Sequence, residues 1–410
     1  MAECIPLRRQ RDYRLLWSAR AVSETGTEIS RLAVPLTAAA LLDATPVQMG
    51  LLTAATTLPY LLIGLPAGAY VDRLARRRPV LVGCEAVSAL AVLTAPLAWL
   101  TGLLTVPWLI TVALTVGVCS VFYRTASLPH LSSVVADHQR TAAIAGFQSV
   151  YSTASVCGPG LAGLLVQALS APLALVVDAA SFLVSAVCLR SIRSPEKAEA
   201  AVPRGSLLTD IREGLRTVMS HHVLRALIGT GVILNFASAG QMALYVLFAV
   251  KILGLPAGVV GLLTASFGVG GLTGATVAPR LAARFTENRV LLGAVVVFPL
   301  EFVALASAHG APSVLVPLLM IAYALSGLAT VMFSVCYGAI QLRESPPELL
   351  GRVNAVMTVA TMGVMTLGGV VGGVLGEVIG LRPTLWACAA IVLPAILIVW
   401  FSPVRRAVTV

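Results

Sequence analysis

Four charged residues share one face of the first long apolar run of this chain. Arg20, Glu24, Glu28 and Arg31 follow one another at spacings of four, four and three residues, which places their side chains along one stripe of a helix. Charged side chains are costly inside a membrane and are functional candidates there by default. A carboxylate paired with an arginine can exchange that partner for a proton or for a cationic ligand. The stripe therefore predicts a site at which a proton and a ligand compete.

The two halves of this stripe have different interpretations. Arg20 and Glu24 either belong to the coupling site or form a solvated ion pair near the mouth of the membrane. Glu28 lies deeper by about 6 Å, at 1.5 Å of rise per residue. We predict a proton-coupling or substrate role for Glu28, with Arg31 as its partner.

Three further acids inside apolar runs are candidates for a role. Glu85 is expected to support a gate at the nearby arginine-rich loop, and Asp178, beside Ser181, to be a structural hydrogen-bonding residue. For Glu301 two roles remain open, an internal pair or a proton relay.

The elements that must position these residues are transmembrane helices. Hydrophobic residues make up 58% of the 410-residue chain and charged residues 11%, with a mean hydropathy of +0.92, which excludes an ordinary soluble protein. The runs are long enough for helical spans, which need about 20 residues, and too long for the strands of a barrel. We predict an all-α integral membrane protein of twelve spans in two pseudo-symmetric six-helix bundles. The spans cover roughly residues 15–42, 47–70, 79–100, 104–128, 141–168, 172–192, 223–252, 257–283, 289–308, 312–340, 348–378 and 382–402.

Basic residues alternate between the two sides of these spans. One set of loops holds almost all of the arginines, and the other holds only Lys251 and Arg382. The positive-inside rule therefore predicts that both termini are cytoplasmic. The same distribution accounts for the net charge of +10 and excludes a nucleic-acid partner, because the charges lie at loop ends beside lipid. The N-terminus lacks the pattern of a cleavable signal peptide.

Internal repeats indicate two related halves. The stretch 64–78, GLPAGAYVDRLARRR, returns in weakened form as 271–285, and the stretch 158–163, GPGLAG, returns as GGVVGG at 368–373. Two related membrane halves with a site between them are typical of secondary transporters. We predict an N-terminal bundle over residues 1–192, a cytoplasmic linker over 193–222 and a C-terminal bundle over 223–410. Within the linker, residues 207–219 predict an amphipathic helix with Leu208, Ile211, Leu215 and Val218 on one stripe.

Enzyme motifs are missing. The chain has no GxxxxGK[ST] loop for ATP, no HExxH and no GxSxG. The seven cysteines lie in predicted spans or at the N-terminus, and no CxxC occurs, so they are interpreted as small core residues. We expect no enzyme activity, no cofactor and no metal.

Several stretches resemble the major facilitator superfamily over essentially the whole chain. The stretch 68–78, GAYVDRLARRR, is similar to the superfamily's loop 2–3 motif, and 158–163 is similar to the helix-5 motif of drug:proton antiporters. The stretches 13–22, 178–182 and 211–216 are similar to the macrolide-efflux and siderophore-exporter branch of transmembrane secretion effectors. The second-half loop departs from the pattern, because Pro279 replaces its acid.

The resemblance implies roles for particular residues. A gate at the cytoplasmic side would use Asp72, the one remaining acid of the two repeated loops. The other gating residues would come from the loop 2–3 motif, from the helix-4 arginine and from the helix-5 motif. The first span would line the central cavity, with further polar groups from spans 7 and 10. The implied gating residues are Gly68, Asp72, Arg73, Arg77, Arg124, Gly158, Pro159 and Gly163, and the implied cavity residues are Arg20, Glu24, Glu28, Arg31, Asn235, Gln241 and Tyr323.

These expectations combine into one function. The chain is predicted to be a proton-coupled exporter of a hydrophobic or amphipathic small molecule, acting by alternating access in the cell membrane, as a monomer with protons, substrate and lipid as its partners. The alternatives are an importer, a siderophore exporter, or a protein that uses this fold for a non-transport role. The substrate does not follow from the fold.

Overall fold

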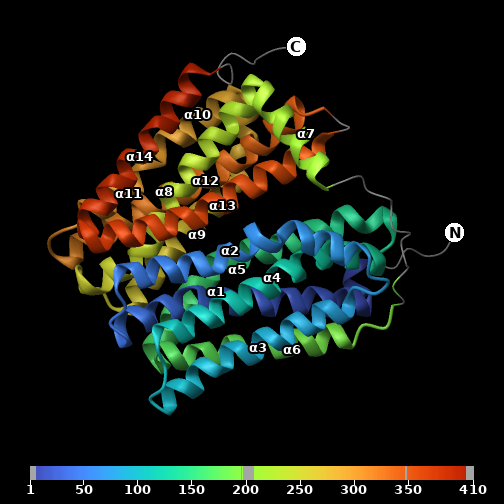
Figure 1. Cartoon of the computed structure of the whole chain (residues 1–410), viewed down its shortest axis with the longest axis horizontal. Coiled ribbons are helices and arrows are strands. Elements are labelled where there is room, and N and C mark those ends of the chain that lie inside the picture. The colour runs from blue at the N-terminus through green and yellow to red at the C-terminus, as the bar shows by residue number, and fades with distance from the viewer. Residues whose placement is uncertain (1–5, 195, 197–206, 347–348, 403–410) are drawn as a thin grey trace. The chain divides into compact units, whose positions relative to one another are not determined.

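The computed structural model describes residues 6–194, 196, 207–346 and 349–402 (Figure 1). All regular elements among these residues are helices. In chain order they are η1 (Leu7–Arg9), α1 (Arg11–Leu41), α2 (Pro46–Asp72), α3 (Arg78–Leu100), α4 (Val106–Val134), η2 (Asp137–Gln139), α5 (Arg140–Leu169), α6 (Ala171–Arg190), α7 (Leu207–Ser220), α8 (His222–Lys251), α9 (Ala257–Phe285), α10 (Glu287–Val297), α11 (Pro299–Ala306), α12 (Pro312–Glu344), α13 (Leu350–Val378) and α14 (Leu381–Phe401).

Eleven helical segments of the described chain are long and apolar enough to cross a membrane, with α10 and α11 counted as one. The helix α1 is 31 residues long but carries too many charges to be among them. With α1 as a further span, the count agrees with the twelve predicted runs. The all-α membrane fold predicted from the sequence is confirmed.

The ninth predicted run contains a break that the sequence analysis did not place. Helix α10 ends at Val297 and α11 begins at Pro299. A proline inside a helix has no N–H to donate and its ring crowds the preceding turn. The run is therefore two short helices joined at Phe298.

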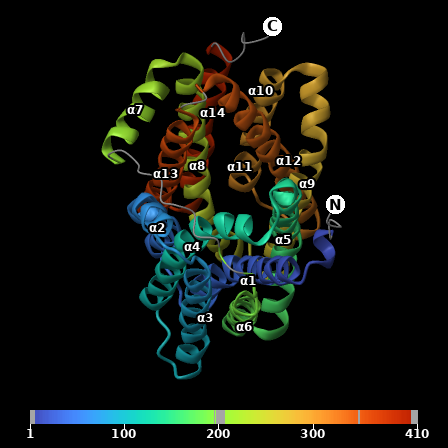
Figure 2. The same ribbon diagram turned by 90° about the vertical axis from the view of Figure 1, so that its right-hand side faces the viewer.

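Packing divides the chain into two compact units, Met1–Leu42 with Leu58–Val202, and Asp43–Thr57 with Pro203–Val410. In the first unit α1 packs on α5 and α6, and α3 packs on α4 and α6 (Figure 2). In the second unit α8 packs on α13 and α14, and α9 packs on α12. The pair α5 and α1 thus has a counterpart in α13 and α8, as the repeated glycine motif indicates. The predicted boundaries at residues 192 and 223 stay a prediction.

Close helix contacts in the second unit depend on small residues. A Cβ added to Gly270 on α9 would overlap the backbone of Ala324 on α12, with the carbonyl carbon 2.6 Å away. Small residues let helix backbones approach in this way where lipid gives no hydrophobic driving force.

A helix, α7, occupies the stretch that was predicted to be amphipathic. It packs on α13, with Val218 fully buried. Leu215, which was expected on the same stripe, is 47% exposed, because Gly214 rather than Leu215 is the residue pressed against the backbone of Arg352. The side chains of Leu208 and Ile211 lie outside the described residues.

Candidate functional site

The charged stripe of α1 forms two ion pairs within the helix. Arg20 lies 2.5 Å from Glu24, and each side chain is 16% exposed. Arg31 lies 3.0 Å from Glu28, whose side chain is 4% exposed while that of Arg31 is 48% exposed. The stripe is therefore not one network of four charges, and Glu28 is its one fully buried member.

Neighbouring helices cover this stripe. The guanidinium of Arg20 lies 5.6 Å from the ring centre of Tyr123 on α4, close enough for a cation–π interaction. A Cβ added to Gly158 on α5 would overlap the Cβ of Glu28 and lie 2.9 Å from its Cγ. The glycine of the predicted helix-5 motif therefore makes the room in which the Glu28 side chain lies.

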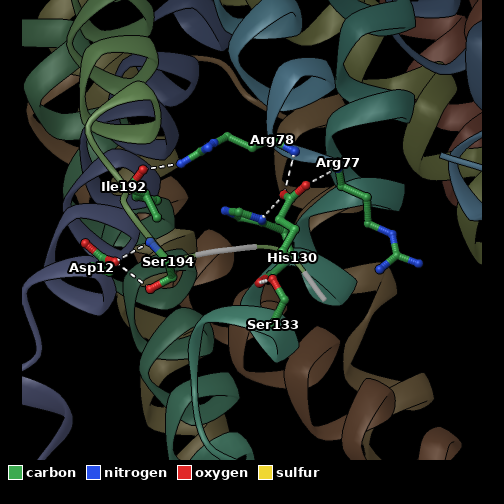
Figure 3. Close-up of polar contacts among 8 residues, drawn as sticks. Asp12, Arg77, Arg78, His130, Ser133, Ile192 and Ser194 are labelled. Carbon is green, nitrogen blue, oxygen red and sulfur yellow. Dashed lines mark hydrogen bonds and ion pairs between the residues drawn. The ribbon is translucent and has the colours of Figure 1, made fainter. Parts of the chain in front are cut away.

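A second site lies at the start of α3 (Figure 3). The carboxylate of Glu196 accepts hydrogen bonds from the backbone N–H of Arg77, at 2.6 Å, and of Arg78, at 2.7 Å. These N–H groups lie at the N-terminus of α3, where backbone N–H groups have no acceptor within the helix. This end of a helix also carries a partial positive charge. The ring of His130, which is fully buried, places Nδ1 2.6 Å from the same carboxylate. Glu196 therefore caps α3 and contacts α4 at one point.

The segment after α6 has two more attachments to this region. The Arg78 side chain donates to the backbone oxygen of Ile192. Asp12 at the start of α1 accepts a hydrogen bond from the backbone N–H of Ser194, at 2.7 Å (Figure 3), and another from that of Arg193, at 3.3 Å. Burial raises the pKa of Asp12, but these hydrogen bonds lower it by more, so that the pKa lies below the ordinary 3.8.

Among the side chains that the structure describes, the other predicted gating residues show no common cluster. Arg73 is exposed, and Arg124 lies 5.9 Å from the ring centre of Tyr60. No neighbour comes within 4 Å of a Cβ added to Gly68. Asp72 is the last residue of α2, and its side chain lies outside the described residues. Pro159 and Gly163 are buried within α5. The gate stays a prediction.

The predicted cavity residues of the second unit do not all lie together. Gln241 on α8 donates to Glu301 at 2.8 Å, and both lie near Tyr323, whose ring centre is 5.4 Å from that of Tyr245. Asn235 donates to the backbone oxygen of its own helix at 2.8 Å. Gln241 and Tyr323 are 4% and 5% exposed, so they form a polar cluster inside the unit around Glu301.

Sequence reasoning missed the Glu196 contact entirely. Glu196 lies in a polar stretch that reads as a linker, and its partner His130 stands near the end of an apolar run. The one signal in the sequence was the arginine-rich loop itself, because its many positive charges favour a neighbouring carboxylate that compensates them. The partner could not be chosen among the acids of the linker without the fold.

Metal binding has no support in the described part of the chain. No three His, Cys, Asp or Glu side chains there gather closely enough to hold an ion. The described cysteines are free thiols.

The fold is that of major facilitator transporters. A crystal structure of a mutant of the nucleoside transporter NupG aligns with a TM-score of 0.77 at 12% identity, over 96% of this chain and 99% of that one. Together with the apolar helices, this likeness shows a multi-pass membrane protein of the major facilitator fold.

The chain belongs to the transmembrane secretion effector family, whose model matches residues 2–409. It is 27% identical to the multidrug efflux pump Tap of Mycolicibacterium fortuitum, over 84% of this chain and 83% of that protein. It is 23% identical to macrolide efflux protein A of Streptococcus pyogenes, over 93% and 95% of the two chains. The predicted family and branch are confirmed.

Proposed function

We propose that this protein exports a hydrophobic or amphipathic small molecule from a bacterial cell in exchange for protons. The observation that carries the proposal is the buried Glu28 carboxylate, which has one charged partner, Arg31, at 3.0 Å. The family supports the direction of transport, and the relatives named for multidrug and macrolide efflux support the substrate class. Both termini would be cytoplasmic, and the monomer would be sufficient.

The position of Glu28 supports proton coupling. A buried carboxylate that loses its cation costs several kcal/mol, because the remaining charge is uncompensated. Binding a proton to Glu28 removes that charge and releases Arg31, and a cationic group of a substrate could take the place of Arg31 instead. Proton and substrate would therefore occupy the site in turn, which is the requirement for antiport.

Alternating access would arise from rocking of residues 1–192 against residues 223–410. The loop after α2 would form part of the gate, and Glu196 would hold that loop in place through Arg77 and Arg78. The helix-5 residues Gly158 and Pro159 would set how closely α5 follows α1.

The test uses cells and proteoliposomes that contain the full chain. Cells are loaded with ethidium, a macrolide or chloramphenicol, and efflux is measured with and without an uncoupler. Proteoliposomes then receive an imposed pH gradient. For one proton per neutral substrate, one pH unit supports an accumulation of about tenfold, since each unit corresponds to 1.36 kcal/mol.

Two variants decide the outcome. Glu28→Gln keeps the size of the side chain and removes its titration, so gradient-driven accumulation is expected to disappear while downhill exchange remains. Glu377→Gln, which changes an exposed acid on α13, is the control. Full accumulation by Glu28→Gln would refute the coupling role. Accumulation inside cells that the uncoupler abolishes, in place of efflux, would support an importer.

A further inference from the structure

Two buried acids face α1 on a side different from the Glu28 stripe. Ser23, Gly26 and Ser30 follow at spacings of three and four residues and form a small, hydroxyl-rich face. This face meets Glu85 of α3 and Asp178 of α6, which are 3% and 1% exposed. Neither acid has a part in the coupling proposed for Glu28.

The partners of these acids are hydroxyl groups. Ser23 donates to the Glu85 carboxyl, with its Oγ 3.1 and 3.2 Å from the two oxygens. Asp178 accepts from Ser181 at 3.2 Å and from Ser30. An ionised carboxylate has about four acceptor positions, and a few hydroxyl hydrogens leave most of them empty.

No basic side chain of the described residues lies within 4.0 Å of either carboxyl. Arg20 lies close enough to Glu85 for its charge to act on that carboxyl, but Arg20 is paired with Glu24. Tyr123 of α4 also faces Glu85, and Tyr151 of α5 faces Arg31 instead. The carboxyl of Asp178 lies close enough for its charge to repel one on Glu85. Two neighbouring buried charges without a cation are strongly unfavourable, whereas two neutral acids are not.

One detail of the packing agrees with neutral acids. A Cβ added to Gly26 would lie 2.5 Å from an Asp178 oxygen, so the backbone of α1 covers that carboxyl. Ser185 of α6 is fully buried beside Glu85. Its hydroxyl can donate to that carboxyl or accept from it, so it fits either protonation state.

We propose that Glu85 and Asp178 form a second proton-binding site, in which both carboxyls are neutral while the serine face of α1 is seated against them. When α1 moves away from α3 and α6, water reaches the carboxyls. Each O–H bond then breaks, the proton passes to water and a carboxylate remains. The site thus stores protons in one conformation and releases them in another. Its transport role rests on the proton-coupled function proposed above.

The protonation itself can be tested without a substrate. The purified full chain in liposomes is examined by infrared spectroscopy at neutral pH, where a protonated carboxyl has a C=O stretch distinct from that of a carboxylate. We expect such a band in the wild type, and we expect it to be reduced in Glu85→Gln and in Asp178→Asn. Glu377→Gln should leave it unchanged. Absence of the band in the wild type, or loss in only one variant, would overturn the pair.

Two further measurements assign the band to its carboxyl and separate this site from the proposed function. Ser30→Ala should shift the frequency of the band that Asp178→Asn reduces, because a hydrogen bond to that carboxyl is lost. An unshifted band would mean that the protonated carboxyl is not that of Asp178. Both amide variants should keep the thermal midpoint of the wild type, because a neutral group replaces a neutral group. If gradient-driven efflux fails in the wild type while the band follows Glu85 and Asp178, the function is wrong and the site stands. If efflux persists and the band is absent, the site is wrong.

Discussion

Replacing Glu196 tests whether the segment after α6 holds the start of α3. Its carboxylate binds two backbone N–H groups, of Arg77 and Arg78, and contacts the buried ring of His130. Its side chain is 8% exposed, so water is a poor replacement. Glu196→Ala therefore leaves two N–H groups at a helix terminus without their acceptor.

The size of the effect follows from helix capping. Removing one capping side chain costs about 0.5–2 kcal/mol. Glu196 satisfies two donors with a charged group, so we take the upper end of that range, about 2 kcal/mol. At 1.36 kcal/mol per factor of ten, the amides of Arg77 and Arg78 should exchange their hydrogens roughly 30-fold faster. Glu196→Gln keeps one acceptor oxygen and should give an intermediate increase.

Hydrogen exchange read by mass spectrometry on peptides that cover residues 74–81 measures this directly in the reconstituted protein. Glu213→Ala is the matched control, because Glu213 also pairs with an arginine, Arg352, but is exposed and lies in the second unit. Unchanged exchange over 74–81 in Glu196→Ala, with the rest of the protein still protected, would refute the capping role of Glu196.

Three other changes have expected outcomes. Gly158→Ala should lower the thermal midpoint in detergent, by an amount that corresponds to about 1–3 kcal/mol, because its methyl group overlaps the Glu28 side chain; an unchanged midpoint would mean that α5 can shift freely. Gly270→Ala should reduce the stability at least as much, because its methyl group meets the backbone of α12. Gly83→Ala is the control: it has open space around the added methyl group, so the protein should be unchanged or more stable by up to about 1 kcal/mol. The pKa of Asp12 is lowered on folding, so its carboxylate stabilises the attachment of the segment after α6 above pH 3.8. That stability is lost as the pH falls through the lowered pKa. Asp12→Asn should therefore remove the acid dependence of amide exchange in residues 193–194, and a dependence that persists in the variant would contradict this role.

The sequence predicted the helices well because their signal is local. Long apolar runs bounded by arginines and prolines define each span without knowledge of its neighbours, and α3 and α14 begin within one residue of the expected positions. The break at Phe298 was harder to predict, because its one signal is Pro299 and the sequence is apolar on both sides of it. The pairing of Glu28 with Arg31 was also local, because both residues lie on one helix.

The contacts between helices could not be predicted in the same way. Ser23 and Glu85 are 62 residues apart, and Glu196 and Arg78 are 118 apart. Whether two such residues meet depends on the rotation and depth of each helix, and an error of one residue turns a side chain by about 100°. Asp178 was interpreted as structural because its one visible neighbour was Ser181, and its contact with Ser30 of α1 was not visible in the sequence.

The difference between local and long-range partners also separates the two proposed proton sites. Both members of the Glu28 pair lie on α1, so a movement of α1 carries them together and does not by itself break the pair. A proton or a ligand must compete for that carboxylate. The contacts of Glu85 and Asp178 with Ser23 and Ser30 join α1 to α3 and α6, so movement of α1 breaks them directly. On these proposals Glu28 responds to what is bound, and the buried acids respond to where α1 lies. Proton release from the second site would then follow the conformational change, even in a variant whose Glu28 can no longer titrate.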